Sequence, residues 1–428
     1  MNILVVGISL FNDELRRRGH SVFHFSDRPY PVENCSAFPY FDPEHLTEAP
    51  ARLREIVDKN NIEALILLDD SKPVVHLGIE NLGIQKIWYS IDTHLHHGWH
   101  RYFGMAFDTV CIAQKKWHDE FRHLANRQWL PLYFWSDSEY IPWEKRTIPI
   151  SFVGNLNREL NPGRIALFDG LRKRGMPVAV HSGDFRTVYR QSKVVVNQCV
   201  NDDVNFRFFE APGCGAVLVN QPLSHSMTEL LVPGEEYVLC KSDDVNGFAE
   251  AISWCFDHEK DCGDISKRGY ERVHREHLLT HRVDQIERIL KGGRQRVEAP
   301  GLPTAGSMAS TFMECARVDY PEYLRSFFLQ KAREFSLPLL ESDWAKIVLA
   351  RSEMELDHVS AAQAYLAAIE DAPNHPLVRH DYYAARMVMA LLKSKVSEAR
   401  RMLESAQLEF PASIELKRIG DALRDIPR

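Results

Sequence analysis

The sequence predicts an α/β protein made of two successive Rossmann-like domains, followed by an all-α domain. Short apolar runs alternate with amphipathic helical stretches, and this pattern starts afresh near residue 148. Continuous apolar runs separated by helices are typical of parallel strands that are buried on both faces. A segment rich in glycine and proline follows at 293–306, and no strand pattern returns after it. We therefore divide the chain into three domains, 1–147, 148–292 and 307–428. The linker 293–306 connects the second domain to the third.

The first domain opens on the apolar run Ile3–Val6, which predicts a buried strand. Gly7 and Ser9 follow it, and we expect them to form a glycine loop at the end of that strand. A helical stretch ends at Gly19, a residue suited to stopping a helix. The later strands of this domain are expected at four apolar runs: 21–25, 64–68, 86–90 and 109–113.

The second domain repeats the same alternation. Its strands are expected at five apolar runs: 150–153, 178–180, 193–196, 216–219 and 237–239. Helices are expected between them, for example over 164–175 and 245–256. Since open α/β sheets bind ligands at the carboxyl ends of their strands, two such domains in succession predict a ligand-binding cleft between them.

The last domain contains two stretches that share a spacing of small residues and proline. The first stretch has Ala361, Tyr365, Ala368 and Pro373, and Ala399, Leu403, Ala406 and Pro411 repeat its intervals. This resembles the second helix of a tetratricopeptide repeat, in which small residues let helices approach closely. The two stretches lie 38 residues apart, whereas the repeat has about 34. A plain helical bundle is the alternative.

Composition narrows the class of protein. A formal net charge of -7 argues against nucleic-acid binding, because contacts to phosphates need a net basic face. The 8 cysteines are scattered without a Cys-x-x-Cys pair, which favours reduced thiols over disulfides or a zinc site. The chain starts directly in a strand-like run, and none of its apolar stretches approaches membrane-spanning length. These features predict a cytoplasmic protein.

The segment 201–219 holds the most informative polar residues. Arg207 and Glu210 are three residues apart and so share one face of a helix. Gly213 and Gly215 follow and let backbone approach a ligand closely. A carboxylate can accept hydrogen bonds from both hydroxyls of a ribose, and a nearby guanidinium suits a pyrophosphate.

This segment resembles the donor-site signature of group 1 glycosyltransferases of the GT-B fold. The resemblance is strongest to the spore-maturation-protein-like branch, which carries an Arg-x-Phe-Glu-x-x-x-x-Gly pattern. In the wider group two acidic residues are separated by seven others, and Asp202 and Glu210 take these positions. The resemblance implies that Glu210 binds the donor ribose and that Asp202 lies near the sugar or its phosphates. Without the resemblance, Glu210 could equally pair with Arg207 alone.

Two further loops fit the same resemblance. Gly154 and Asn155 follow the first strand of the second domain, where family members bind the donor phosphates, and Arg158 would add a cation to stabilise the leaving diphosphate. Ser182 and Gly183 follow the next strand, where relatives build the wall that contacts the base. The predicted donor-binding residues are Gly154, Asn155, Arg158, Ser182, Gly183, Asp202, Arg207, Glu210 and Gly215.

Asp92 and His94 follow a strand of the first domain and are our candidates for catalysis. Relatives have a His or Asp in the corresponding loop, where it supplies a general base or orients the acceptor hydroxyl. The neighbouring His96, His97 and His100 raise the alternative of a metal site, but no second cluster of ligands accompanies them. We read those three as solvated or catalytic histidines and expect no metal.

Glycosyl transfer from a nucleoside-diphosphate sugar is the function that these features predict, with that sugar as cosubstrate and no other cofactor. No Asp-x-Asp motif follows a strand, so the reaction is expected to be metal-independent, and the resemblance favours retention of configuration. A dinucleotide-dependent oxidoreductase would need Gly-x-Gly-x-x-Gly after the first strand, where the chain has only Gly7. A non-catalytic nucleotide-binding scaffold, with a helical domain that binds a partner, is the second alternative.

The acceptor is predicted from the domain arrangement alone. Helical repeats beside a transferase suggest a polypeptide acceptor, such as flagellin, since concave helical surfaces bind extended peptides. A lipid-linked or polysaccharide acceptor is the alternative, and the repeats could instead mediate a homodimer. The donor base and sugar stay open.

Overall fold

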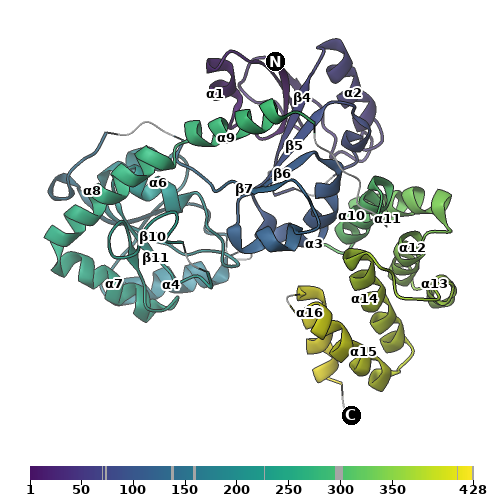
Figure 1. Ribbon diagram of the computed structural model, residues 1–428. Coiled ribbons are helices and arrows are strands. Elements are labelled where there is room, and N and C mark those ends of the chain that lie inside the picture. The colour runs from purple at the N-terminus through teal and green to yellow at the C-terminus, as the bar shows by residue number, and fades with distance from the viewer. Residues whose placement is uncertain are drawn as a thin grey trace.

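The computed structural model contains two parallel sheets in succession and a helical region at the carboxyl end (Figure 1). It describes residues 1–69, 71–72, 75–135, 139–157, 161–225, 227–294, 302–411 and 413–426. The predicted fold class, two Rossmann-like units followed by an all-α region, is confirmed.

The first sheet has seven parallel strands in the order β3-β2-β1-β4-β5-β6-β7. The four central strands are almost entirely buried, as their continuous apolar sequences require. The strands are β1 (Asn2–Gly7), β2 (Ser21–Ser26), β3 (Cys35–Ala37), β4 (Ala64–Leu68), β5 (Gln85–Ser90), β6 (Thr109–Ile112) and β7 (Arg127–Trp129). Helices α1 (Asn12–Arg17), α2 (Ala49–Lys59) and α3 (Thr93–Phe103) connect them, with short 3-10 turns such as η3 (Lys115–Phe121).

The second sheet has five parallel strands in the order β12-β11-β10-β8-β9. The order reverses after β8, which pairs with β9 on one side and β10 on the other. The strands are β8 (Ile148–Val153), β9 (Ala179–His181), β10 (Ser192–Asn197), β11 (Val217–Asn220) and β12 (Val238–Leu239). The helices are α4 (Pro162–Lys173), α5 (Phe185–Gln191), α6 (Arg207–Gly213), α7 (Val245–Asp257) and α8 (Glu259–Glu276). Since ligands bind where strand order reverses, the loops after β8 and β10 are the expected binding edge.

The chain crosses between the two units twice, and the two crossings are hydrogen-bonded to each other. The Phe134 N–H donates to the His277 carbonyl at 2.7 Å, and the Leu279 N–H donates to the Phe134 carbonyl at 2.8 Å. The second crossing leads into α9 (Leu279–Gly292), which returns to the first unit and lies near α1 (Figure 1). Arg18 of the first unit pairs there with Glu287 at 3.2 Å.

In the helical region, helices that follow one another in the chain pack against each other in pairs. It consists of α10 (Thr304–Ala316), α11 (Glu322–Ser336), α12 (Asp343–Glu355), α13 (Val359–Ala367), α14 (Pro376–Leu392), α15 (Val396–Glu409) and α16 (Ile414–Arg424). Its first helix, α10, packs against α3, and their apolar side chains share one core with the first sheet. Seven residues of the predicted linker, 295–301, lie outside the described residues.

The shared spacing of alanines does not produce a shared packing. Ala399 and Ala406 of α15 are buried, as a repeat would require. Ala361 and Ala368 are exposed instead, and the next residue in each case is the buried one: Ala362 in α13 and Ile369 just after it. The interpretation as tetratricopeptide repeats therefore gains no support from α13.

Candidate active site

The loop after β8 is shaped by a glycine that no other residue could replace without a shift. Gly154 has a φ of 155°, and a Cβ atom there would lie 2.8 Å from Arg207 Nη2 and 2.9 Å from the ring of Phe152. Its N–H donates to the His181 carbonyl at the end of β9 at 3.1 Å. The neighbouring strand ends thus hold the backbone of this loop tightly, as a phosphate-binding loop requires.

Arg207 joins three elements at this edge. Its guanidinium donates to the Tyr189 hydroxyl at 3.1 Å, to Asn197 Oδ1 at 2.8 Å and to the Val153 carbonyl at 2.9 Å. It also lies over the ring of Phe152, 4.1 Å from the centroid. Arg207 therefore links the ends of β8 and β10 and is held in one position by these contacts.

A second guanidinium, that of Arg164 in the first turn of α4, lies beside the same loop. It donates to the Asn155 carbonyl at 3.0 Å and lies 5.0 Å from the centroid of Phe152. Burial, and then the proximity of Arg207, lowers the pKa of Arg164 to about 10, so it stays charged at neutral pH. One buried and one half-buried guanidinium next to a glycine loop make this edge electropositive.

The predicted base-side residues occupy the same edge. Ser182 and Gly183 follow β9 and are exposed there, and Gly183 has a φ of 95°. Arg158 lies outside the described residues. Gly215 is not brought to this edge: it precedes β11, where a Cβ atom would lie 2.9 Å from the ring of Tyr140, and it serves packing at the amino end of that strand.

Glu210 lies on α6 one turn after Arg207. Burial raises the pKa of Glu210 to about 7, although Arg207 and Trp135 act in the opposite direction. The indole N–H of Trp135 donates to Glu210 Oε1 at 3.4 Å, and 42% of Trp135 is exposed. A desolvated carboxyl with one weak partner keeps most of its hydrogen-bonding capacity for a ligand.

The two acids before α6 differ in their surroundings. Asp202, with a φ of 65°, accepts hydrogen bonds from Ser224 and from Lys116 Nζ, the latter at 2.5 Å. Burial opposes ionisation of Asp202, but these bonds outweigh it and lower its pKa. Asp203 is buried, which raises its pKa to about 6, and it accepts from the Val200 N–H at 2.7 Å.

His94 of the first unit faces Asp203 of the second. Their Nε2 and Oδ2 atoms lie 4.0 Å apart. Burial, followed by His96, lowers the pKa of His94 to about 4, so the imidazole is neutral at physiological pH. A neutral imidazole can donate a hydrogen bond to a substrate hydroxyl or accept one from it. Asp203 was not among the residues selected from the sequence, and only the fold reveals its contact with His94.

Asp92 directly precedes α3, the helix that carries His94, and anchors the start of that helix. Its N–H donates to Asp69 Oδ2 at 3.1 Å, and its carboxylate accepts a hydrogen bond from Ser71. Gly7 lies near this loop at the end of β1, where its Cα approaches the Leu68 carbonyl so closely that a Cβ atom would collide with it. A cavity of about 50 Å³ lies here, lined by Gly7, Asp69 and aromatic rings. Ser9 follows, and its carbonyl accepts the Asn12 N–H at 3.1 Å.

The other histidines of α3 point to separate partners. His97 stacks on Trp117 with 4.6 Å between the ring centroids. His100 is buried and hydrogen-bonds through Nδ1 to the Ser90 hydroxyl at 2.8 Å. Within the described residues, three side chains that could ligate a metal lie close together elsewhere, at His380, Asp381 and Glu415, and not among these histidines.

Gln114, which no sequence motif singles out, joins the two units next to this site. Gln114, after β6, donates to the Val204 carbonyl at 3.2 Å and accepts from the Val204 N–H at 2.8 Å. These bonds, together with the Lys116–Asp202 pair, hold the 200–204 loop against the first unit. The candidate site thus lies where the carboxyl edges of the two sheets meet.

This arrangement agrees with a family comparison. Residues 123–288 match the family model described as glycosyl transferase-like. This region is a glycosyl transferase-like domain. It contains the second sheet, both crossings and every predicted donor-binding residue. A search of curated proteins found no match.

The chain is similar to several solved structures, and the two with a TM-score above 0.5 share its fold. A glycosyltransferase from Rickettsia africae matches 68% of this chain and 98% of its own length, at 12% identity and a TM-score of 0.51. A sucrose-phosphate synthase from Thermosynechococcus elongatus matches the same shares at 11% identity and a TM-score of 0.51. HepE from Anabaena in complex with UDP-glucose covers 68% of this chain and 100% of its own, at 11% identity and a TM-score of 0.48.

The chain therefore combines the GT-B glycosyltransferase fold with a glycosyl transferase-like domain and adds a helical region at its carboxyl end. The described part of the chain contains no helix with the length and apolar character needed to cross a membrane.

Proposed function

We propose that this protein transfers a sugar from a nucleoside-diphosphate donor to an acceptor hydroxyl, at the junction between the two sheets. The observation that carries the proposal is the meeting of Gly154, two guanidiniums and Glu210 at one sheet edge, opposite His94. A glycine loop flanked by cations suits a diphosphate, and a carboxylate with free acceptor capacity suits a ribose diol.

Each residue then has a distinct role. Gly154 lets the backbone approach the diphosphate, and Arg164 and Arg207 stabilise the negative charge that develops as the diphosphate leaves. Glu210 accepts hydrogen bonds from the ribose hydroxyls. His94, neutral at physiological pH, orients a hydroxyl of the sugar or of the acceptor, and Asp203 behind it holds the ring in place.

The finer features of the reaction are part of the same proposal. We propose that the two arginines replace a metal ion in neutralising the diphosphate, and that the anomeric configuration is retained, as the resemblance implies. We further propose a polypeptide acceptor, because the helical region packs directly on α3, the helix that carries His94.

The test is a thermal-shift and calorimetric screen of UDP, GDP, CDP and dTDP on the wild type, Glu210→Ala and the matched control Glu144→Ala. Glu144 is an exposed carboxylate in a 3-10 turn that precedes β8, whereas the site lies at the other end of that strand. Binding to the native state raises stability by about 2.7 kcal/mol at 100 times Kd. One nucleotide should stabilise the wild type and the control but not Glu210→Ala. Failure of all four nucleotides to bind contradicts the proposal, and binding without turnover of any nucleotide sugar indicates the non-catalytic scaffold.

A further inference from the structure

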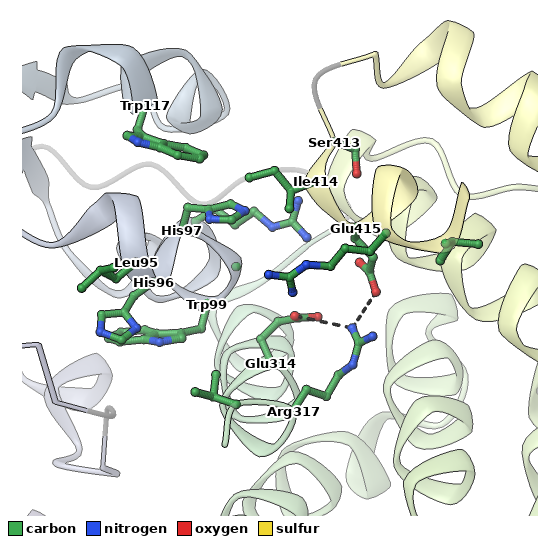
Figure 2. A pocket seen from close by; sticks show the side chains of 15 residues that line it. Leu95, His96, His97, Trp99, Trp117, Glu314, Arg317, Ser413, Ile414 and Glu415 are labelled. Carbon is green, nitrogen blue, oxygen red and sulfur yellow. Dashed lines mark hydrogen bonds and ion pairs between the residues drawn. The ribbon is translucent and has the colours of Figure 1, made fainter. Parts of the chain in front are cut away.

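A second cavity lies away from the proposed donor site, between the first unit and the helical region. Its volume is about 220 Å³, and its walls come from α3, from the 3-10 turn η3, from the end of α10 and from the start of α16 (Figure 2). The charged side chains that line it are Arg101, Arg317, Arg418, Glu314 and Glu415.

The two carboxylates are already neutralised by arginines. Glu415 Oε1 pairs with Arg317 Nη1 at 2.5 Å and with Arg351 Nη2 at 3.4 Å. Glu314 pairs with the same two arginines. A third arginine, Arg101 of the cavity wall, is also paired: its Nη2 lies 3.7 Å from Asp381 Oδ1. His380, Asp381 and Glu415 have possible metal-ligand atoms within 4.8 Å of one another. Because the arginines already neutralise these carboxylates, the group does not need a metal ion.

Arg418 is the cation that remains uncommitted. It is exposed at the mouth of the cavity, and no ion pair or hydrogen bond to its side chain is found within the described residues. The cavity therefore has one guanidinium more than its carboxylates can neutralise.

Buried donors without partners add to this positive character. The indole N–H groups of Trp99 and Trp117 and the Nε of Arg101 are buried, and none of them has a hydrogen-bond partner in the described part of the chain. Trp99 is only 3% exposed. At the start of α16, Ser413 caps the helix by accepting the Leu416 N–H, and the first turn lines the cavity with its positive dipole end. One buried acceptor, Glu415 Oε2, also has no hydrogen-bond partner in the described part of the chain, but its carboxylate is already paired with arginines. The unpartnered donors therefore suit a ligand group that accepts hydrogen bonds, such as a carboxylate or a phosphate.

The cavity also adjoins the proposed reaction site. His97 in its wall lies one helical turn after His94, which faces Asp203. Trp117 in its wall directly follows Lys116, which pairs with Asp202. A chain that occupied this cavity would therefore extend past α3 towards the junction of the two sheets.

We propose that this cavity holds an acidic side chain of a polypeptide acceptor, close in sequence to the hydroxyl that receives the sugar. The inference rests on the proposed function and names its acceptor class. A polypeptide is favoured over a free anion because Leu95, 44% exposed, and Ile414 add apolar surface to the rim, which an inorganic ion does not use. A side chain on a peptide contacts the cation and the apolar rim together.

The experiment measures binding of short peptides to the full chain by calorimetry. The probes are the acetylated, amidated pentapeptide Ser-Glu-Ser-Glu-Ser, its lysine counterpart Ser-Lys-Ser-Lys-Ser, and inorganic phosphate. The variants are Arg418→Glu and the control Lys417→Glu, which makes the same charge change at the neighbouring exposed residue of α16 outside the cavity. Trp117→Phe keeps an aromatic ring against His97 and removes the N–H together with part of the indole surface.

We expect the acidic peptide to bind, Arg418→Glu to weaken it about tenfold, Trp117→Phe to weaken it about threefold, and Lys417→Glu to change it less than twofold. Equal weakening by Lys417→Glu, equal binding of the lysine peptide, or no binding of the acidic peptide overturns the proposal. Phosphate that binds as tightly as the peptide, with the same loss in Arg418→Glu, shows a small-anion site and overturns the polypeptide occupant. Nucleotide binding by the wild type is measured separately, so a failure of the proposed function is distinguished from a failure of this site.

Discussion

Replacing Glu210 by Gln tests both the burial of this carboxyl and its proposed role. Burial raises the pKa of Glu210 from 4.5 to about 7. Between pH 4.5 and about 7, Glu210 therefore keeps its proton in the folded protein and loses it in the unfolded chain. As a result, the free energy of unfolding falls as the pH rises through this window. Gln is uncharged throughout and does not suffer this loss.

The size of the effect follows from the pKa shift. A change from 4.5 to about 7 corresponds to at most about 3 kcal/mol at pH 8. Solvent reaches the half-buried side chain and reduces this value, so we expect Glu210→Gln to be about 1–2 kcal/mol more stable than the wild type at pH 8. At pH 5 most of the folded protein is protonated at Glu210, and the difference should shrink to less than about 1 kcal/mol.

Urea unfolding at pH 5, 6, 7 and 8 measures this difference, with the exposed Glu144→Gln as control. The same variant should bind the nucleotide at least about tenfold more weakly at pH 8, since an amide offers one acceptor oxygen where a carboxylate offers two. Greater stability with weaker binding is the signature of a residue kept for function. The reasoning would be refuted if the difference in free energy of unfolding between Glu210→Gln and the wild type were the same at pH 5 and at pH 8.

Three further results are expected. Gly154→Ala should lower the free energy of unfolding by about 1–3 kcal/mol in urea, because a Cβ atom would lie 2.8 Å from Arg207 Nη2 on a backbone with positive φ; unchanged stability would show that the loop can move aside. Arg207→Lys should cost about 2 kcal/mol by the same measurement, because one ammonium cannot replace the three hydrogen bonds to Tyr189, Asn197 and Val153; a cost below about 0.5 kcal/mol would contradict its positioning role. Adding EDTA should leave nucleotide binding by calorimetry unchanged, whereas a loss restored by Mg²⁺ would contradict the proposed metal independence.

The strands that could be predicted from the sequence are those with continuous apolar runs. All central strands of both sheets were found in this way, since a strand buried on both faces must be apolar along its length. The strands β3 (Cys35–Ala37) and β7 (Arg127–Trp129) were missed, because their sequences, Cys-Ser-Ala and Arg-Gln-Trp, contain no continuous apolar run. Backbone pairing alone defines them, and it leaves no mark in the composition.

The candidate site was predictable one sheet at a time. Glycines and acids after apolar strands indicate the binding edge of a single unit, and Gly154 and Glu210 do lie at that edge. Contacts between the units could not be predicted, because nothing in the spacing relates His94 to Asp203 or Gln114 to Val204. The hydrogen bonds of Arg207 were equally hidden: nothing in the sequence indicates that its guanidinium also holds strand ends together.

The return of α9 to the first unit has a consequence for anyone who would recombine this enzyme with its relatives. Arg18 pairs with Glu287, and Arg282 donates to the Pro131 carbonyl at 2.8 Å, so α9 is bonded to the first unit and to the first crossing. A chimera spliced at residue 292 would lay a foreign helix on native α1. One spliced at residues 134 and 278, where the two crossings bond to each other, would exchange the donor-binding unit as an insertion and leave the native surface of the first unit intact.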